Sequence, residues 1–100
     1  MAFTLKIMPS ALKELQGIGV FYRRQIAQAI DDQLYHQATT PTRHRKIFQV
    51  TEASFAFEPP LWELRIGDFR VFYDVDEPTQ TVYVRAVREK PPHTTTEEVR

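Results

Sequence analysis

Several residue types and motifs are missing from this chain, and each absence removes a class of function. The sequence of 100 residues contains no cysteine and only three glycines. The missing cysteines exclude a disulfide framework and a cysteine-ligated metal site, and they are typical of a reducing cytosol. The chain also lacks a glycine-rich phosphate loop and any cluster with metal-ligand spacing. We therefore expect neither a metal nor a small-molecule cofactor.

Charge and hydropathy narrow the choice of partners. Thirteen basic and 13 acidic side chains leave a formal net charge of zero, whereas nucleic-acid-binding proteins usually carry a basic excess. Binding to nucleic acid would therefore require cations gathered in one place. No apolar run is long enough to cross a bilayer, and the start of the chain lacks the features of a signal peptide. We expect a cytoplasmic protein that does not contact a membrane.

The first part of the chain predicts one strand and two helices. The hydrophobic fraction of 42% and the length of 100 residues indicate a single folded domain, residues 1–100, with one modest core. Alternating apolar residues over 3–7 predict a strand that ends at Pro9. Ser10 suits the N-cap of a short helix, which glycines at 17 and 19 end. Apolar residues at every fourth position predict a longer helix from Phe21 to about Ala38.

The second part predicts three antiparallel strands. The pattern is poor from 39 to 60, and we expect an irregular connection there, although Ile47 and Phe48 are compatible with a strand. Strands follow at 61–66 and 70–75, joined by a tight turn at Gly67-Asp68, and a third strand covers 82–87. We predict an α+β fold: strand, helical hairpin and three-stranded antiparallel meander, with the helices on one face and the other face free for a ligand.

Arginines recur through the meander, at Arg65, Arg70, Arg85 and Arg88, with Lys90 directly after it. Alternation in a strand places such cations on one face of the sheet while the apolar residues build the core. Strand parity selects three of the arginines for one candidate site. Arg85 is offset from Arg88 by an odd number, so a regular strand would turn it to the opposite face. This basic face is the best candidate for chemistry.

The segment LWELRIGDFRVFYDVDE, followed by VYVRAVREK, resembles the RelE/ParE superfamily of toxins from bacterial type II toxin–antitoxin systems. The most specific part is the hairpin pattern G-[DE]-[FY]-R-V-x-Y-x-V, which begins at Gly67, and the resemblance spans about residues 3–95. It implies a RelE-like fold and a small cytosolic toxin neutralised by an antitoxin, which we expect to be a small acidic protein. RelE-like members cut mRNA on the ribosome, ParE-like members poison DNA gyrase, and some relatives have no activity.

The resemblance to the RelE-like branch also implies catalytic residues. Cleavage of RNA needs a proton acceptor, a proton donor and cations that stabilise the phosphorane. Arg70 matches the hairpin arginine of the family, which holds the transition-state phosphate. Arg65 and Arg88 match basic positions on the neighbouring strands. His93 is the candidate for proton transfer, but its surroundings, PPHTTTEEV, lack the terminal aromatic residue that is usual in the family.

Four further residues are candidates for binding RNA. Arg45 and Lys46 belong to a short basic run that could grip ribosomal RNA by charge, or form a solvated loop. Lys90 extends the basic cluster of the last strand. Phe72 could stack on an unpaired base or lie under the antitoxin.

Structural interpretations of the central residues remain open at this point. Arg70 could pair with Asp74 or Glu63, and Arg65 could pair with Asp68 or Asp74. Glu63 could act as a base, or be a salt-bridged surface carboxylate.

The leading hypothesis is a ribosome-dependent, metal-independent mRNA endonuclease whose partners are the antitoxin, the ribosome and mRNA. The clustered arginines favour it. A gyrase poison, or an attenuated relative that only binds the antitoxin, is the alternative. The missing terminal tyrosine and the zero net charge favour that alternative.

Overall fold

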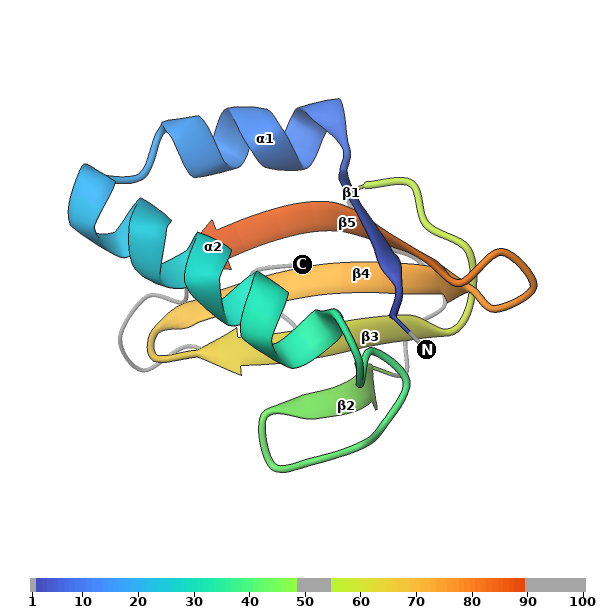
Figure 1. Ribbon diagram of the computed structural model, residues 1–100. Helices are drawn as coiled ribbons and strands as arrows, with labels where there is room; N and C mark the ends of the chain where they lie inside the picture. The colour runs from blue at the N-terminus through green and yellow to red at the C-terminus, as the bar shows by residue number, and fades with distance from the viewer. Residues whose placement is uncertain (1, 49–54, 90–100) are drawn as a thin grey trace.

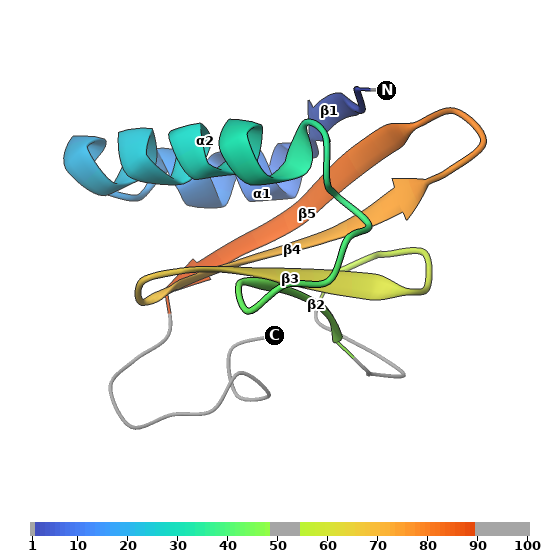
Figure 2. The same ribbon diagram turned by 60° about the horizontal axis from the view of Figure 1, so that its bottom comes forward.

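Two helices lie across one face of a five-stranded sheet in the computed structural model, which describes residues 2–48 and 55–89 (Figure 1). The strand order is β1-β5-β4-β3-β2, with β1 parallel to β5 and the other neighbours antiparallel. Both helices lie on the same side of the sheet (Figure 2), which confirms the predicted α+β class. The elements are, in chain order, β1 (Thr4–Ile7), α1 (Pro9–Gln16), α2 (Val20–Leu34), β2 (Arg45–Phe48), β3 (Leu61–Ile66), β4 (Phe69–Asp76) and β5 (Thr81–Glu89).

The predicted meander is only the centre of the sheet. It is extended by β1 at one edge and by β2 at the other. Strand β2 was not assigned from the sequence, because its pattern does not look like a half-buried strand. On the face toward the helices, Arg45 is buried while Ile47 is 44% exposed. On this face the polar side chain is buried and the apolar side chain is exposed, which is the reverse of the usual pattern in a half-buried strand.

The main core lies between the helices and the sheet. It contains Ile26, Ile30 and Leu34 from α2 and alternate residues of the central strands. Tyr73 is among them, and its hydroxyl donates a hydrogen bond of 2.7 Å to the Ala38 carbonyl. Burial raises the pKa of this hydroxyl far above its ordinary value, although the positive charge of Arg45 lowers it by a smaller amount. The predicted inward direction of the apolar residues in these strands is confirmed.

A second apolar cluster covers part of the opposite face. It is formed by Phe48, Leu61, Phe72 and Ala86, with Phe55 and Phe57 packed against it. The prediction that this face is free for a ligand is therefore wrong for its central part. Phe72 is 0% exposed, with ring centroids 5.7 Å from Phe48 and 5.6 Å from Phe55, so it has no open face on which a base could stack.

Helix α1 closes the edge of the sheet where β1 ends. Pairing of β1 with β5 covers only residues 81–84 of β5. Beyond them, the Ser10 hydroxyl donates to the Arg85 carbonyl over 3.2 Å, and the Val87 N–H donates to Glu14 Oε1 over 3.1 Å. The helix begins at Pro9, so Ser10 lies inside it and does not act as the predicted N-cap. These side chains satisfy strand groups that would otherwise be an open edge.

Arg45 joins β2 to the end of α2. Its side chain is buried, with 1% exposure. The guanidinium donates to the Gln33 carbonyl and side chain, to the Gln37 side chain and to the Thr40 carbonyl. The Gln33 carbonyl belongs to the last turn of α2, which ends at Leu34. Carbonyls in the last turn of a helix lack helical partners. The predicted RNA contact by Arg45 is therefore wrong, because the side chain is enclosed and its donors are occupied.

We predict that Arg45→Met lowers the free energy of unfolding by about 2 to 4 kcal/mol, because it leaves several buried acceptors without a donor. Urea denaturation followed by circular dichroism measures the change. Arg43→Met is the matched control, because Arg43 is exposed two residues earlier and its loss should change the stability by less than about 0.5 kcal/mol. Equal effects of the two substitutions would contradict a structural role for Arg45.

Candidate functional site

Three arginines lie side by side across the three central strands. Pairing places Arg65 of β3 opposite Arg70 of β4, and Arg70 opposite Arg88 of β5. Directly opposite residues of antiparallel strands project from the same face. We call these three residues the arginine row. Like charges in directly opposite positions destabilise a sheet, so the row opposes the stability of the fold.

Arg70 is the middle member of the row and is 7% exposed. Its Nη1 donates to the Gly67 carbonyl at 2.8 Å and to the Phe69 carbonyl at 2.9 Å, while its Nε is buried without a hydrogen-bond partner among residues 2–48 and 55–89. Neither predicted carboxylate partner, Asp74 or Glu63, pairs with it, and in the part of the chain that the structure describes it forms no ion pair. A largely buried cation in this state favours an added anion.

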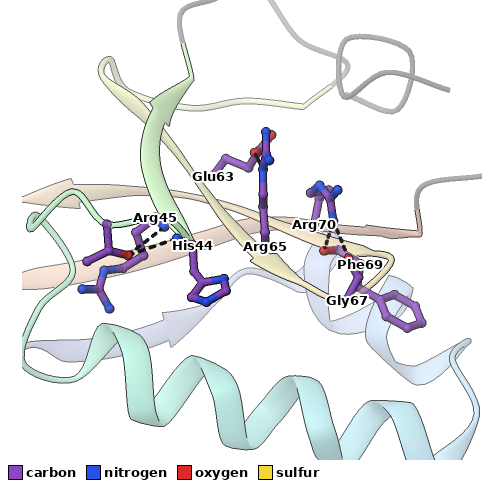
Figure 3. A network of polar contacts seen from close by, with 8 residues as sticks. His44, Arg45, Glu63, Arg65, Gly67, Phe69 and Arg70 are labelled. Atoms are coloured by element: carbon purple, nitrogen blue, oxygen red, sulfur yellow. Dashed lines mark hydrogen bonds and ion pairs between the residues drawn. The ribbon is translucent and has the colours of Figure 1, made fainter. Parts of the chain in front are cut away.

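The turn between β3 and β4 sets the position of Arg70. Gly67 has φ of 57°, a left-handed conformation that strains residues with a Cβ. The turn at Gly67-Asp68, predicted from the sequence, directs the Gly67 carbonyl at the Arg70 guanidinium (Figure 3). The hairpin motif therefore determines both the register of the row and the orientation of its middle member.

Arg65 and Glu63 form an ion pair on the face away from the helices. The Arg65 Nε donates to Glu63 Oε1 over 2.8 Å, and the two side chains are 40% and 0% exposed. Glu63 is therefore a buried carboxylate and not the surface residue considered from the sequence. The predicted alternatives for Arg65, Asp68 and Asp74, do not pair with it. The guanidinium stands away from the strand with the glutamate beside it (Figure 3).

Arg88 is held by helix α1. Its Nε contacts Glu14 Oε2, and its guanidinium lies over the Phe55 ring, 5.6 Å from the centroid. Glu14 uses its other oxygen to accept the Val87 N–H, so one carboxylate fixes both the strand and its arginine. Glu14 was not predicted from the sequence, because nothing in the pattern of α1 indicates that this position meets the last strand.

Arg85 lies outside the row for a reason other than the one predicted. The pairing of β4 with β5 shifts between Phe72 and Tyr73, which leaves Arg85 as the extra residue of a β-bulge. Its Nε bonds Asp74 Oδ2 over 2.6 Å. Asp74 shares the face of Arg70, so the bulge turns Arg85 to that face, and the ion pair with Asp74 keeps it apart from the row.

The remaining predicted residues are placed as follows. Lys46 is exposed on β2 and pairs in register with Glu63, so it projects from the face of the row. Lys90 and His93 lie outside the described residues. Among the described residues, the His36 ring makes a T-shaped contact with the Tyr35 ring, with centroids 4.7 Å apart, and the His44 ring points away from the Arg65 guanidinium (Figure 3).

No group of three or more histidine, cysteine, aspartate or glutamate side chains within 2–48 and 55–89 is arranged to hold a metal ion. None of the described helices has the length and apolar character needed to cross a membrane. The geometry of the arginine row suits an anion with several oxygens.

Comparisons with known structures show what this fold is similar to. The RelBE2 toxin–antitoxin complex from Mycobacterium tuberculosis has 16% identity, covers 90% of this chain and 100% of its own, and has a TM-score of 0.67. The RelE–RelB complex from Pyrococcus horikoshii has 19% identity, coverages of 94% and 100%, and a TM-score of 0.68. The isolated RelE toxin from E. coli has 18% identity, coverages of 97% and 94%, and a TM-score of 0.68. At these identities the likeness shows the fold alone.

Sequence comparison identifies the family. No curated protein matches the chain significantly. The family model described as the ParE toxin of the type II toxin–antitoxin system parDE matches residues 5–90, a range that contains both helices, β2 to β5, all of β1 except Thr4, and the arginine row. The protein therefore belongs to the ParE toxin family, within the RelE/ParE superfamily of toxins from type II toxin–antitoxin systems.

Proposed function

We propose that this toxin is a ribosome-dependent endonuclease that inhibits translation by cutting mRNA, and that the arginine row binds the scissile phosphate. The supporting observation is that Arg70, between two other arginines, is largely buried and forms no ion pair with a described residue. A buried cation that lowers stability and forms no structural ion pair is typical of functional sites.

The reaction gives the row a definite task. Attack of a ribose 2′-hydroxyl on the adjacent phosphorus forms a phosphorane, and its additional negative charge must be stabilised. Arg65 binds Glu63 through Nε alone, so its two Nη groups can donate hydrogen bonds to two phosphate oxygens. Arg70 can add its Nη2. Because the strands fix these donors, little reorganisation is needed when the charge develops.

Proton transfer requires another group. His36 contacts Tyr35, and the His44 ring points away from Arg65, so the proposal assigns proton transfer to neither. In this proposal His93 retains the role of general acid or base, since its ordinary pKa lies near neutrality. Lys90 and Lys46 add positive charge at the RNA path. The reaction assigned to this site does not require a metal or a cofactor.

The proposed partners are a cognate antitoxin, the ribosome and mRNA, in the cytoplasm. The neighbours from M. tuberculosis and P. horikoshii are toxin–antitoxin complexes by name. A small acidic antitoxin could neutralise the row with its carboxylates. It could also cover the apolar start of α2, where Val20, Phe21 and Tyr22 are 52%, 74% and 51% exposed, with an amphipathic helix.

A gyrase inhibitor is the second candidate function. The matching family model bears the ParE name, and ParE-like members poison gyrase. The exposed aromatic pair Phe21 and Tyr22, with ring centroids 5.2 Å apart, is a surface suited to another protein. In this function the arginine row would bind the antitoxin or the gyrase and would not cut RNA.

We predict that the purified toxin produces codon-phased cuts in mRNA in a translating extract, and that Arg70→Ala lowers the cleavage rate at least about 100-fold, because a fixed donor to the phosphorane is lost. Primer extension on a defined message maps and measures the cuts. Arg43→Ala is the control for a nearby exposed arginine and should retain the parental rate.

The same preparation separates the two functions. Unbroken mRNA together with gyrase-dependent DNA breaks would refute the endonuclease and support the second candidate. A fully active Arg70→Ala variant would instead remove Arg70 from the site.

We also predict that inorganic phosphate stabilises the protein through the row. At a phosphate concentration about five times its Kd, the free energy of unfolding should rise by about 1 kcal/mol relative to chloride at equal ionic strength. Arg70→Met should abolish this rise, whereas Arg43→Met should preserve it. Urea denaturation in the two salts measures the difference, and an equal rise in all three proteins would indicate a general salt effect.

A further inference from the structure

Glu63 is a buried carboxylate whose hydrogen bonding is incomplete among the residues that the structure describes. Its side chain is 0% exposed and accepts one hydrogen bond, of 2.8 Å, from the Arg65 Nε. The other oxygen, Oε2, is buried and finds no hydrogen-bond partner within the described part of the chain. A buried carboxylate in this state is costly for a fold, so its contribution to stability is a poor explanation for its presence.

The Asp74–Arg85 pair shows what a complete buried carboxylate looks like on the same face. Asp74 is 2% exposed and receives three bonds, from Arg85 Nε at 2.6 Å, Arg85 Nη2 at 3.2 Å and the Glu58 N–H at 3.1 Å. The Nε and Nη2 of Arg85, which lie on one side of its guanidinium, both donate to Asp74. The Glu63 contact is different, because it takes only the Nε of its arginine and leaves both Nη groups without a bond to a described residue.

Arg65 needs such a restraint in order to stay in the row. Its side chain is long and 40% exposed, and Arg70 lies directly opposite it with a charge of the same sign. Repulsion and rotamer freedom would both move the guanidinium into solvent. A carboxylate two residues earlier on the same strand lies on the same face and counteracts both effects (Figure 3).

We propose that Glu63 is a positioning residue, which holds the Arg65 guanidinium beside Arg70 so that both Arg65 Nη groups face a bound phosphate. Glu63 thereby acts through Arg65 and does not itself touch RNA. The inference rests on the proposed RNA cleavage for its kinetic consequence, while the restraint of Arg65 is a property of the toxin alone.

A double-mutant cycle tests the kinetic consequence. Glu63→Gln keeps the shape and an acceptor oxygen, and it should lower the mRNA cleavage rate about 10-fold. Glu63→Met removes the acceptor and should lower it about 100-fold, as expected for a misplaced reacting group. In an Arg65→Ala background, neither substitution should have a further effect, because the group being positioned is absent. The proposal would be overturned if either Glu63 substitution lowered the cleavage rate of Arg65→Ala by the same factor as it lowers the rate of the parent.

Nuclear magnetic resonance tests the restraint without any activity. The Nε–Hε signal of Arg65, assigned by its loss in Arg65→Lys, should be sharp in the parent and broadened by water exchange in Glu63→Met. An unchanged signal would overturn the proposal even if cleavage falls. A parent that gives this signal but cuts no mRNA refutes the proposed function and supports the restraint.

Asp74→Asn is the matched control for loss of a buried ion pair. It should leave the Arg65 signal and the cleavage rate unchanged, and thermal melting establishes that each variant is folded at the assay temperature. The assignment would be overturned if Asp74→Asn changed both the Arg65 signal and the cleavage rate as much as Glu63→Gln does. Any buried carboxylate on this face would then have the same effect.

Discussion

Cross-strand register is the constraint on which the rest of this structure depends. The turn at Gly67-Asp68 fixes β3 against β4, so that Arg65 faces Arg70, and the pairing of β4 with β5 brings Arg88 into the same row. A shift by one residue would turn every side chain of a strand to the other face. It would bury the arginines in the core and expose the apolar residues that hold the helices. The stability of the main core therefore also determines the charge pattern of the opposite face.

The arginines of this sheet show how partners decide the role of one residue type. Arg45 is enclosed by acceptors at the end of α2, and Arg85 is neutralised by Asp74. In the row, glutamates hold Arg65 and Arg88, while backbone carbonyls hold Arg70. A carbonyl orients a guanidinium without cancelling its charge. The middle of the row therefore keeps the positive charge that an anion requires, although the net charge of the chain is zero.

The face that carries the row is both a second core and a candidate site. Phe72 lies in an aromatic cluster at its centre, and Phe55 from that cluster supports the Arg88 guanidinium. Packing of this kind limits the movement of the cations beside it.

The sequence by itself determined the α+β class, the direction of the strand residues and the hairpin motif around Arg70, since these follow from local periodicity and turn chemistry. Tertiary structure decided the rest. Arg45 and Lys46 are neighbours in one basic run, yet one is buried and the other exposed, because only the fold brings the end of α2 onto β2. Similarly, Glu14 reaches Arg88 through contact between distant segments. Local patterns specify which face a side chain takes where the strand pairing is regular, whereas the bulge at Arg85 and the charge partners depend on contacts that only the folded chain creates.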